Sequence, residues 1–486
     1  MATTVATTRA AGAPPRTNWE YLVTLRIEVP DRTGMLGQVT SAIGEAGGNI
    51  GPIDIVERKR NTIIRDITVA LENMGAADAL VDAVLAVPGV KVLQVMDPIT
   101  KVHDGGKIEV AVRTPVLSES DLMAVYTPGV AHVCQDIHGN QSRVWEMTGK
   151  GSTIAIITDG SAVLGLGNIG PEAGLPVMEG KSLLLKELSG VNAWPLCLAT
   201  QDPDEIIQVG KAVAPGFGAI MLEDISAPRC FYIEQQLDKL LDIPVFHDDQ
   251  HGTAVVVLAG LLNALKVVDK RIQDLKVVVM GLGAAGIACA RILLGAGVGQ
   301  VVGVGRPGIV WDSLKDRADS SEAIYEYKAM NQARHGTLED AMRGADVFIG
   351  VSGPRVIQPS HVQSMARDPI VFALANPEPE IRPEEAMAAG AKVCATGRSD
   401  APNQINNMLC FPGLFRGALA VRATTVTHEM KAAAAEAIAS AVTPNELAKG
   451  RVIPRPMNRA VVRRVAKAVA QAAIESGVAR CKATNL

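Results

Sequence analysis

The chain has 486 residues, of which 48% are hydrophobic and 20% charged, and its formal net charge is −4 at pH 7. This length and composition predict a folded protein of several domains and exclude a largely disordered chain. The slightly acidic balance and the 3% aromatic content argue against nucleic acid as a partner, because phosphate binding needs a basic surface and base stacking needs aromatic rings.

The N-terminal residues 1–20 contain no acid before Glu20. An organelle transit peptide is one interpretation of this segment, but we favour a disordered tail because an amphipathic arginine pattern is missing. The apolar run 254–265 contains Asn263 and is too short for a membrane span, so we interpret it as a core helix. Seven scattered cysteines without a C-x-x-C pair favour a reducing, cytoplasmic location.

Residues 21–98 predict a small domain with the order βαββαβ. Segments 21–29, 50–56, 62–71 and 90–95 are strand-like, and apolar residues recur at helical spacing in 35–46 and 76–85. This order is typical of a split-βαβ sandwich. A Gly-containing segment of mixed charge, 100–107, is interpreted as a linker.

Two further α/β units are expected after the linker. In the first, 107–250, we expect strands that end in polar residues at 154–158, 163–170, 219–223 and 244–246. The second, 251–480, alternates strands with helices as a doubly wound, Rossmann-type sheet does. Its predicted strands are 276–280, 301–304, 347–351, 370–375 and 392–395, and Ala-rich helices at 432–441 and 459–476 end the chain.

A glycine-rich motif stands between strand 276–280 and the predicted helix 287–294. It consists of Gly281, Gly283, Ala284, Ala285 and Gly286 around Leu282. Glycines at this spacing allow a tight turn and a close approach to a dinucleotide pyrophosphate at a helix N-terminus. The next strand is followed by Arg306 rather than by an acid. Arginine suits the 2′-phosphate of NADP, but a solvated loop arginine is equally plausible, so NAD and NADP both stay open.

Two carboxylate pairs follow predicted strands of the first α/β unit. Glu223 and Asp224 follow one strand, and Asp248 and Asp249 follow another. Carboxylates without soft ligands suit Mg²⁺ or Mn²⁺, although surface acids or helix caps are the ordinary alternative. His247 and His251 flank the second pair, and we favour loop histidines over a transition-metal pair.

Five other side chains are candidates for chemistry or substrate binding. Tyr126 stands before a Pro-Gly turn, Lys181 follows a glycine in an apolar segment, and amides occur at Asn376, Asn406 and Asn407. A tyrosine can act as an acid and a desolvated lysine as a base, while the amides can bind a carboxylate. Packing, surface exposure and turn formation are the competing explanations.

These stretches together resemble malic enzymes of the smaller bacterial form over about residues 113–478. The resemblance rests on YTPGVA, TDGSAVLGLGNIGPEAGLPVMEGK, LEDIS, PVFHDDQHGTA, GLGAAG, ALANPEPEI and NQINNMLCFPG, in this order. It implies that Tyr126 is the general acid, Lys181 the general base and Asp248 its support. It further implies that Glu223, Asp224 and Asp249 bind the metal.

The same resemblance assigns Asn376 and Asn407, with neighbouring Asn406, to substrate binding, and Asn376 also to the cofactor. In the larger eukaryotic form an arginine binds the substrate carboxylate, but Ala162 stands there in this chain. Asparagines and backbone amides are therefore expected to bind the carboxylate instead.

Residues 21–99 resemble an ACT domain through DRTGML at 31–36 and GGNI at 47–50. The resemblance implies pairing and binding of a small effector such as an amino acid, whereas pairing without a ligand is the alternative.

The complete interpretation is an NAD(P)-dependent oxidative decarboxylation of (S)-malate by a homodimer or higher homo-oligomer, with no membrane partner. The alternatives are a metal-independent amino-acid dehydrogenase and an effector-sensing protein that has lost catalysis.

Overall fold

A computed structural model describes residues 21–71, 75–163, 165–281, 283–305, 308–309, 331 and 335–483. The chain divides into two compact units, Met1–Glu109 and Val110–Leu486. The predicted tail 1–20 and Arg306 lie outside the described residues.

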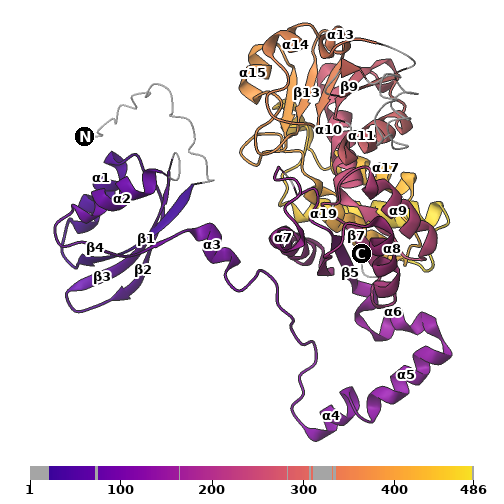
Figure 1. Ribbon diagram of the computed structural model, residues 1–486, viewed down its shortest axis with the longest axis horizontal. Coiled ribbons are helices and arrows are strands. Elements are labelled where there is room, and N and C mark those ends of the chain that lie inside the picture. Colours follow the sequence, from indigo (N-terminus) through magenta and orange to yellow (C-terminus); the bar gives the residue numbers. More distant parts are fainter. Residues whose placement is uncertain are drawn as a thin grey trace, which may run out of the picture. The chain divides into compact units, whose positions relative to one another are not determined.

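The first unit has the predicted βαββαβ order (Figure 1). Its antiparallel sheet has the strand order β2-β3-β1-β4. Apolar residues of β1, β3 and both longer helices share one core that includes Leu25, Ile43 and Leu80. The elements are β1 (Leu22–Pro30), α1 (Met35–Glu45), β2 (Asn49–Arg58), β3 (Thr62–Ala70), α2 (Ala76–Leu85), β4 (Lys91–Met96) and α3 (Pro98–His103). Helix α3 overlaps the expected linker because Asp97 caps it and Pro98 begins it.

The second unit begins with short helices and a parallel sheet of order β6-β5-β7-β8. The strands are β5 (Thr153–Thr158), β6 (Asn192–Cys197), β7 (Ala219–Leu222) and β8 (Val245–His247). The helices are α4 (Glu119–Val125), α5 (Gly129–Gly139), α6 (Val144–Met147), α7 (Pro171–Ser189), α8 (Pro203–Val213) and α9 (Arg229–Leu240).

The strand expected at 163–170 is wrong. Gly165, Gly167 and Gly170 adopt positive φ, and only one isolated bridge joins Val163 to Gly167. Positive φ interrupts an extended strand, so this segment forms a turn-rich loop.

The doubly wound sheet has the order β11-β10-β9-β12-β13-β14, and among the described strands of this sheet only β11 runs antiparallel. Its strands are β9 (Lys276–Met280), β10 (Gln300–Gly305), β11 (Gly308–Ile309), β12 (Val347–Gly350), β13 (Ile370–Ala373) and β14 (Val393–Thr396). The helices are α10 (Thr253–Val268), α11 (Ala284–Gly295), α13 (Leu338–Met342), α14 (Pro359–Gln363), α15 (Pro383–Ala388), α16 (Phe411–Ala420), α17 (His428–Ala439), α18 (Pro444–Ala448) and α19 (Arg459–Glu475). The predicted fold class is confirmed.

One apolar cluster joins the two sheets of the second unit, with Ile154 of β5, Leu261 of α10 and Val277 of β9 among its members. Among the described residues, the helical segment Asp248–Val268 is long and apolar enough to cross a membrane, but 72% of its tested stretch is buried inside the protein. Asn263 donates from this helix to the carbonyls of Ala439 and Val452 at 2.9 and 3.0 Å. The segment is therefore the predicted core helix.

Candidate active site

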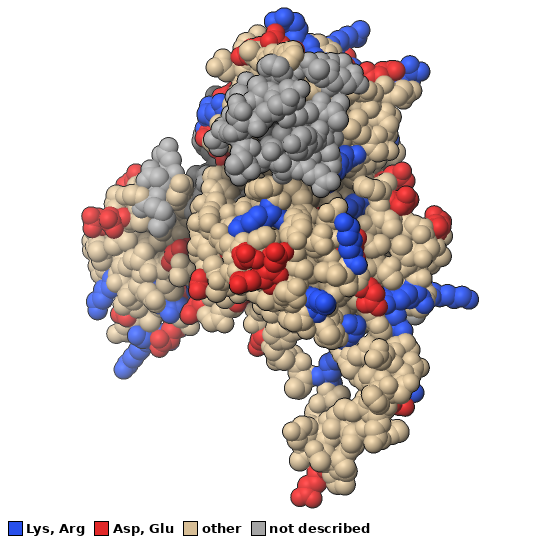
Figure 2. All heavy atoms as spheres, turned by 45° about the vertical axis from the view of Figure 1, so that its right-hand side comes forward, with Lys and Arg blue, Asp and Glu red and all other residues tan. Residues whose placement is uncertain are grey.

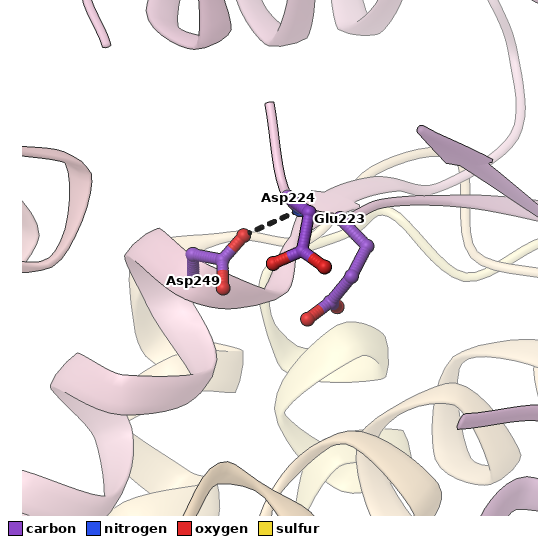
Figure 3. Close-up of side chains that lie close together, drawn as sticks. All are labelled: Glu223, Asp224 and Asp249. Carbon is purple, nitrogen blue, oxygen red and sulfur yellow. Dashed lines mark hydrogen bonds between the residues drawn. The ribbon is translucent and has the colours of Figure 1, made fainter. Parts of the chain in front are cut away.

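The sheet topology brings the two predicted carboxylate pairs together. Strands β7 and β8 are parallel neighbours with Leu222 opposite His247, so both pairs leave the sheet at the same edge. Glu223, Asp224 and Asp249 each offer an oxygen, and these oxygens lie within 4.8 Å of one another. Figure 3 shows the three carboxylates around one space, with the backbone N–H of Asp224 donating to Asp249 Oδ2 at 2.8 Å.

The carboxylates of this cluster carry more buried charge than their neighbours neutralise. Burial, reinforced by Asp249, raises the pKa of Asp224 to about 8, and burial also raises the pKa of Glu223 well above its usual value. Glu223 Oε2 and Asp224 Oδ2 are buried and accept no hydrogen bond from the described residues. Hard oxygen donors with unused acceptor capacity fit a Mg²⁺ or Mn²⁺ ion, so the residues present suit the predicted metal.

Lys181 lies on α7 and points into the same cluster. Its Nζ is 2.5 Å from Asp248 Oδ2 and 2.9 Å from Glu223 Oε1, and it lies 4.7 Å from the centre of the Phe411 ring. Burial lowers the pKa of Lys181, but Asp248, Glu223 and Asp249 together outweigh it and hold the pKa above its usual value. Lys181 is therefore an ammonium here, and not the free amine that burial alone predicts.

Tyr126 is placed differently from the other predicted catalytic residues. It follows α4 and is 67% exposed. Helices α4 and α5 bury none of their residues, and they form an arm that leaves the rest of the second unit (Figure 1). The arm lies at the bottom of Figure 2, where most of its surface is uncharged. The structure does not bring Tyr126 to Lys181 of the same chain.

The predicted amides lie at the margins of the cluster. Asn407 borders the catalytic segment, Asp248–Gly252, since its Cβ lies 3.1 Å from the position that a Cβ on Gly252 would take. Asn376 follows β13, and a Cβ on Gly165 would lie 3.0 Å from its carbonyl oxygen. The glycine-rich loop thus approaches Asn376 closely. Asn406 accepts from the N–H of Met408 at 2.9 Å and so caps the following turn.

The glycine motif occupies the turn between β9 and α11. Gly281 has φ +133°, and a Cβ there would lie 2.7 Å from the Val351 carbonyl oxygen. Gly283 is the N-cap of α11, whose first turn contains Ala284, Ala285 and Gly286. The first N–H groups of a helix such as α11 have no acceptor within the helix, and they suit a pyrophosphate. Arg306 and Leu282 lie outside the described residues.

Sequence reasoning missed Asp159, Phe411 and Glu234. Asp159 follows β5 as Glu223 follows β7, is fully buried and pairs with Arg229 at 3.0 Å. Its position after a strand would have indicated it. No local pattern indicates that the Phe411 ring lies beside Lys181 or that Glu234 bonds His251 at 3.0 Å.

Three regions of the chain match family models. Residues 250–474 match the NAD-binding domain of malic enzyme, residues 105–238 its N-terminal domain, and residues 17–94 an ACT domain.

Relatives cover nearly the whole chain. It is 52% identical over 460 residues to the NAD-dependent malic enzyme of Geobacillus stearothermophilus, covering 94% of this chain and 95% of that protein. Identity to the NADP-dependent malic enzyme of Escherichia coli K12 is 45% over 392 residues, or 77% of this chain and 51% of that protein. The crystal structure of malic enzyme from Pyrococcus horikoshii superimposes with a TM-score of 0.74 at 51% identity, over 78% of this chain and 89% of that one. The chain therefore belongs to the malic enzyme family and carries an ACT domain at its N-terminal side.

Proposed function

We propose that the chain oxidises and decarboxylates (S)-malate to pyruvate and CO₂, with reduction of NAD⁺ or NADP⁺ and with a divalent metal ion. The observation that carries the proposal is the pairing of Lys181 with Asp248 beside three clustered carboxylates. A metal-independent amino-acid dehydrogenase does not need such a cluster. Family membership and the intact Lys181–Asp248 pair also argue against a protein that has lost catalysis.

Lys181 and Tyr126 divide the proton transfers of this reaction. Lys181 would lose its own proton to solvent once a divalent cation bound by the carboxylates offsets the negative charges that hold it as an ammonium. As the free amine it then takes the proton of the C2 hydroxyl while hydride passes from C2 to the nicotinamide, and the alcohol becomes a ketone. The C3–C4 bond then breaks, the C4 carboxylate leaves as CO₂, and the electron pair of the broken bond remains in an enolate. Tyr126 donates the proton that C3 needs to give pyruvate. When bound by Glu223, Asp224 and Asp249, a divalent cation supplies positive charge that neutralises the carboxylates and stabilises the developing oxyanion.

In this proposal Tyr126 serves the active site that contains the Lys181 of a second copy of the chain. The arm that holds Tyr126 exposes large apolar side chains, including Leu122 at 50% and Met123 at 55%. Apolar surface of this kind is typical of an interface between subunits. A homodimer with exchanged arms would cover it and would supply the missing acid. Light scattering that shows only monomer would contradict this arrangement.

Mixed dimers test the exchange directly. Tyr126→Phe and Lys181→Ala proteins are each expected to be almost inactive. If the two residues serve one site from different subunits, unfolding and refolding an equal mixture restores part of the wild-type rate. A mixture that stays inactive while dimers form would contradict exchange.

NAD⁺ is the cofactor that we propose the chain prefers. The NAD-dependent relative of G. stearothermophilus is 52% identical to the chain, whereas the E. coli NADP-dependent relative is 45% identical. Comparison of kcat/KM for NAD⁺ and NADP⁺ tests the preference, and a higher value with NADP⁺ would reverse it.

The proposed domain limits assign one role to each of three parts of the chain. We propose residues 21–99 as a regulatory domain that binds a small effector such as an amino acid, 107–250 as the substrate and metal domain, and 251–480 as the NAD(P) domain. The ranges of the three family models support this division. A cytoplasmic location remains a prediction.

Absorbance at the NAD(P)H band, with (S)-malate and Mn²⁺, tests the reaction. Signal that EDTA abolishes and Mn²⁺ restores, with pyruvate as the product, is expected. Equal signal in EDTA would contradict the metal requirement, and no signal with either dinucleotide would contradict the proposed substrate.

A further inference from the structure

The segment that holds Asp248 and Asp249 has an unusual backbone. Residues Asp248–Gly252 form a single π-helical turn between β8 and α10. Such turns are rare and need support, because their hydrogen bonds are less regular than those of an α-helix. The aspartates act on Lys181 and on the metal position, so the conformation of this turn sets the geometry of the site.

One carboxylate outside the site bonds to the segment on both sides of these aspartates. Glu234 Oε1 accepts from the backbone N–H of His247 at 2.8 Å. Its other oxygen, Oε2, lies 3.0 Å from Gln250 Nε2 and 3.0 Å from His251 Nε2. Along the chain, the two aspartates therefore lie between His247 on one side and Gln250 and His251 on the other, all three of which Glu234 contacts.

Glu234 is itself held on a rigid element. It lies on α9, whose residues Cys230, Ile233 and Leu237 are buried in the core under β5 and β7. Its side chain is 14% exposed, and His251 contributes to holding its pKa at about 2 against the effect of burial, so it is ionised at neutral pH. An ionised acceptor on a packed helix makes strong hydrogen bonds with little freedom to move.

We infer that Glu234 is a positioning residue of the active site, which fixes the Asp248–Asp249 turn through His247, Gln250 and His251. The inference rests on the proposed function only for the identity of the metal site. Outer partners of this kind typically account for about 10–100-fold in metal affinity or activity.

Glu234→Gln is the informative variant. The amide keeps the size of the side chain but places a donor where one carboxylate oxygen accepts, and it removes the charge. Asp238→Asn is the matched control. It lies one turn further along α9 and accepts from Thr425 Oγ1 at 2.6 Å, away from the catalytic segment. Gln250→Ala removes one of the three contacts without changing Glu234 and serves if Glu234→Gln does not fold.

Calorimetric titration of the full chain with Mn²⁺ alone is the main measurement, with the unfolding temperature of the metal-free protein beside it. We expect the dissociation constant to rise about 10–100-fold in Glu234→Gln, to rise less in Gln250→Ala, and to stay within threefold in Asp238→Asn. At saturating Mn²⁺ we also expect kcat to fall in Glu234→Gln, because Asp248 belongs to the same turn.

The outcomes separate this inference from the proposed function. A folded Glu234→Gln protein with the wild-type Mn²⁺ dissociation constant would overturn the inference, as would equal weakening in Asp238→Asn. Wild-type protein that does not bind Mn²⁺ would also overturn it. Wild-type protein that binds Mn²⁺ but does not oxidise malate would refute the proposed function alone. A merely structural Glu234 would lower the unfolding temperature without changing Mn²⁺ affinity.

Discussion

Gly252 leaves no room for a side chain beside Asp248 in the active site. A Cβ at this position would overlap Asp248 Oδ1, and it would lie 2.8 Å from Asp248 Cγ and 3.1 Å from Asn407 Cβ. The backbone itself accepts alanine, since φ is −60° and ψ is −47°. Gly252→Ala therefore tests space and not backbone strain. Asp248 would have to rotate, and its contact with Lys181 would be lost.

The expected effects on stability and on rate differ in size. Overpacking costs about 1–3 kcal/mol, while alanine regains about 1 kcal/mol of helix propensity, so the free energy of unfolding falls by roughly 0–2 kcal/mol. The lost contact is a charge-assisted hydrogen bond worth about 1.5–3 kcal/mol. At 1.36 kcal/mol per tenfold in rate, kcat is expected to fall roughly 10–150-fold.

Urea unfolding and malate oxidation at saturating Mn²⁺ measure the two effects. Gly295→Ala in α11 is the control, because nothing lies within 4 Å of its added Cβ, and we expect it to keep the wild-type kcat. A Gly252→Ala protein with wild-type kcat would refute the argument that Asp248 must stay beside Lys181.

At a Mn²⁺ concentration of 100 times the dissociation constant, Mn²⁺ is expected to stabilise the wild-type protein against unfolding by about 2.7 kcal/mol. The unfolding temperature of the wild-type protein should therefore rise, and that of Asp249→Asn should not. An equal shift in both would contradict the ligand assignment. Gly281→Ala is expected to raise KM for the dinucleotide about tenfold or more, because the methyl group would crowd the Val351 carbonyl; unchanged KM would refute the close approach. Lys181→Ala should lower kcat by about 10²–10⁴, whereas Lys186→Ala, on the same helix, should not. Equal rates in the two would argue against Lys181 as the base.

Local patterns were sufficient for most of the fold. The alternation in the first domain and the glycine motif after β9 predicted elements that the structure contains. Strand β6 was missed because Trp194 and Pro195 interrupt a recognisable alternation. The helix expected at 432–441 begins earlier, at His428, since Thr427 caps it. These differences arise from turn and cap chemistry, which periodicity does not represent.

The candidate site was predictable as a set of residues but not as a charge distribution. The strand-end positions of Glu223 and Asp248 indicated a shared edge, because parallel strands end together. The sequence could not show that both would lie within 3 Å of Lys181. That proximity reverses the effect of burial on the pKa of Lys181. The sign of a pKa shift depends on neighbours that are distant in sequence, so a motif alone does not determine it.

Tyr126 illustrates a different limit of sequence reasoning. The motif identifies the residue, but a motif is the same in every copy of a chain and does not say which copy's site the side chain completes. In the structure α4 and α5 bury none of their residues, although Leu122, Met123 and Val130 on them are apolar. Apolar helices that bury nothing within their own chain need another surface to cover them. The second copy that we propose would meet that need and would place a proton donor beside the lysine of the first copy.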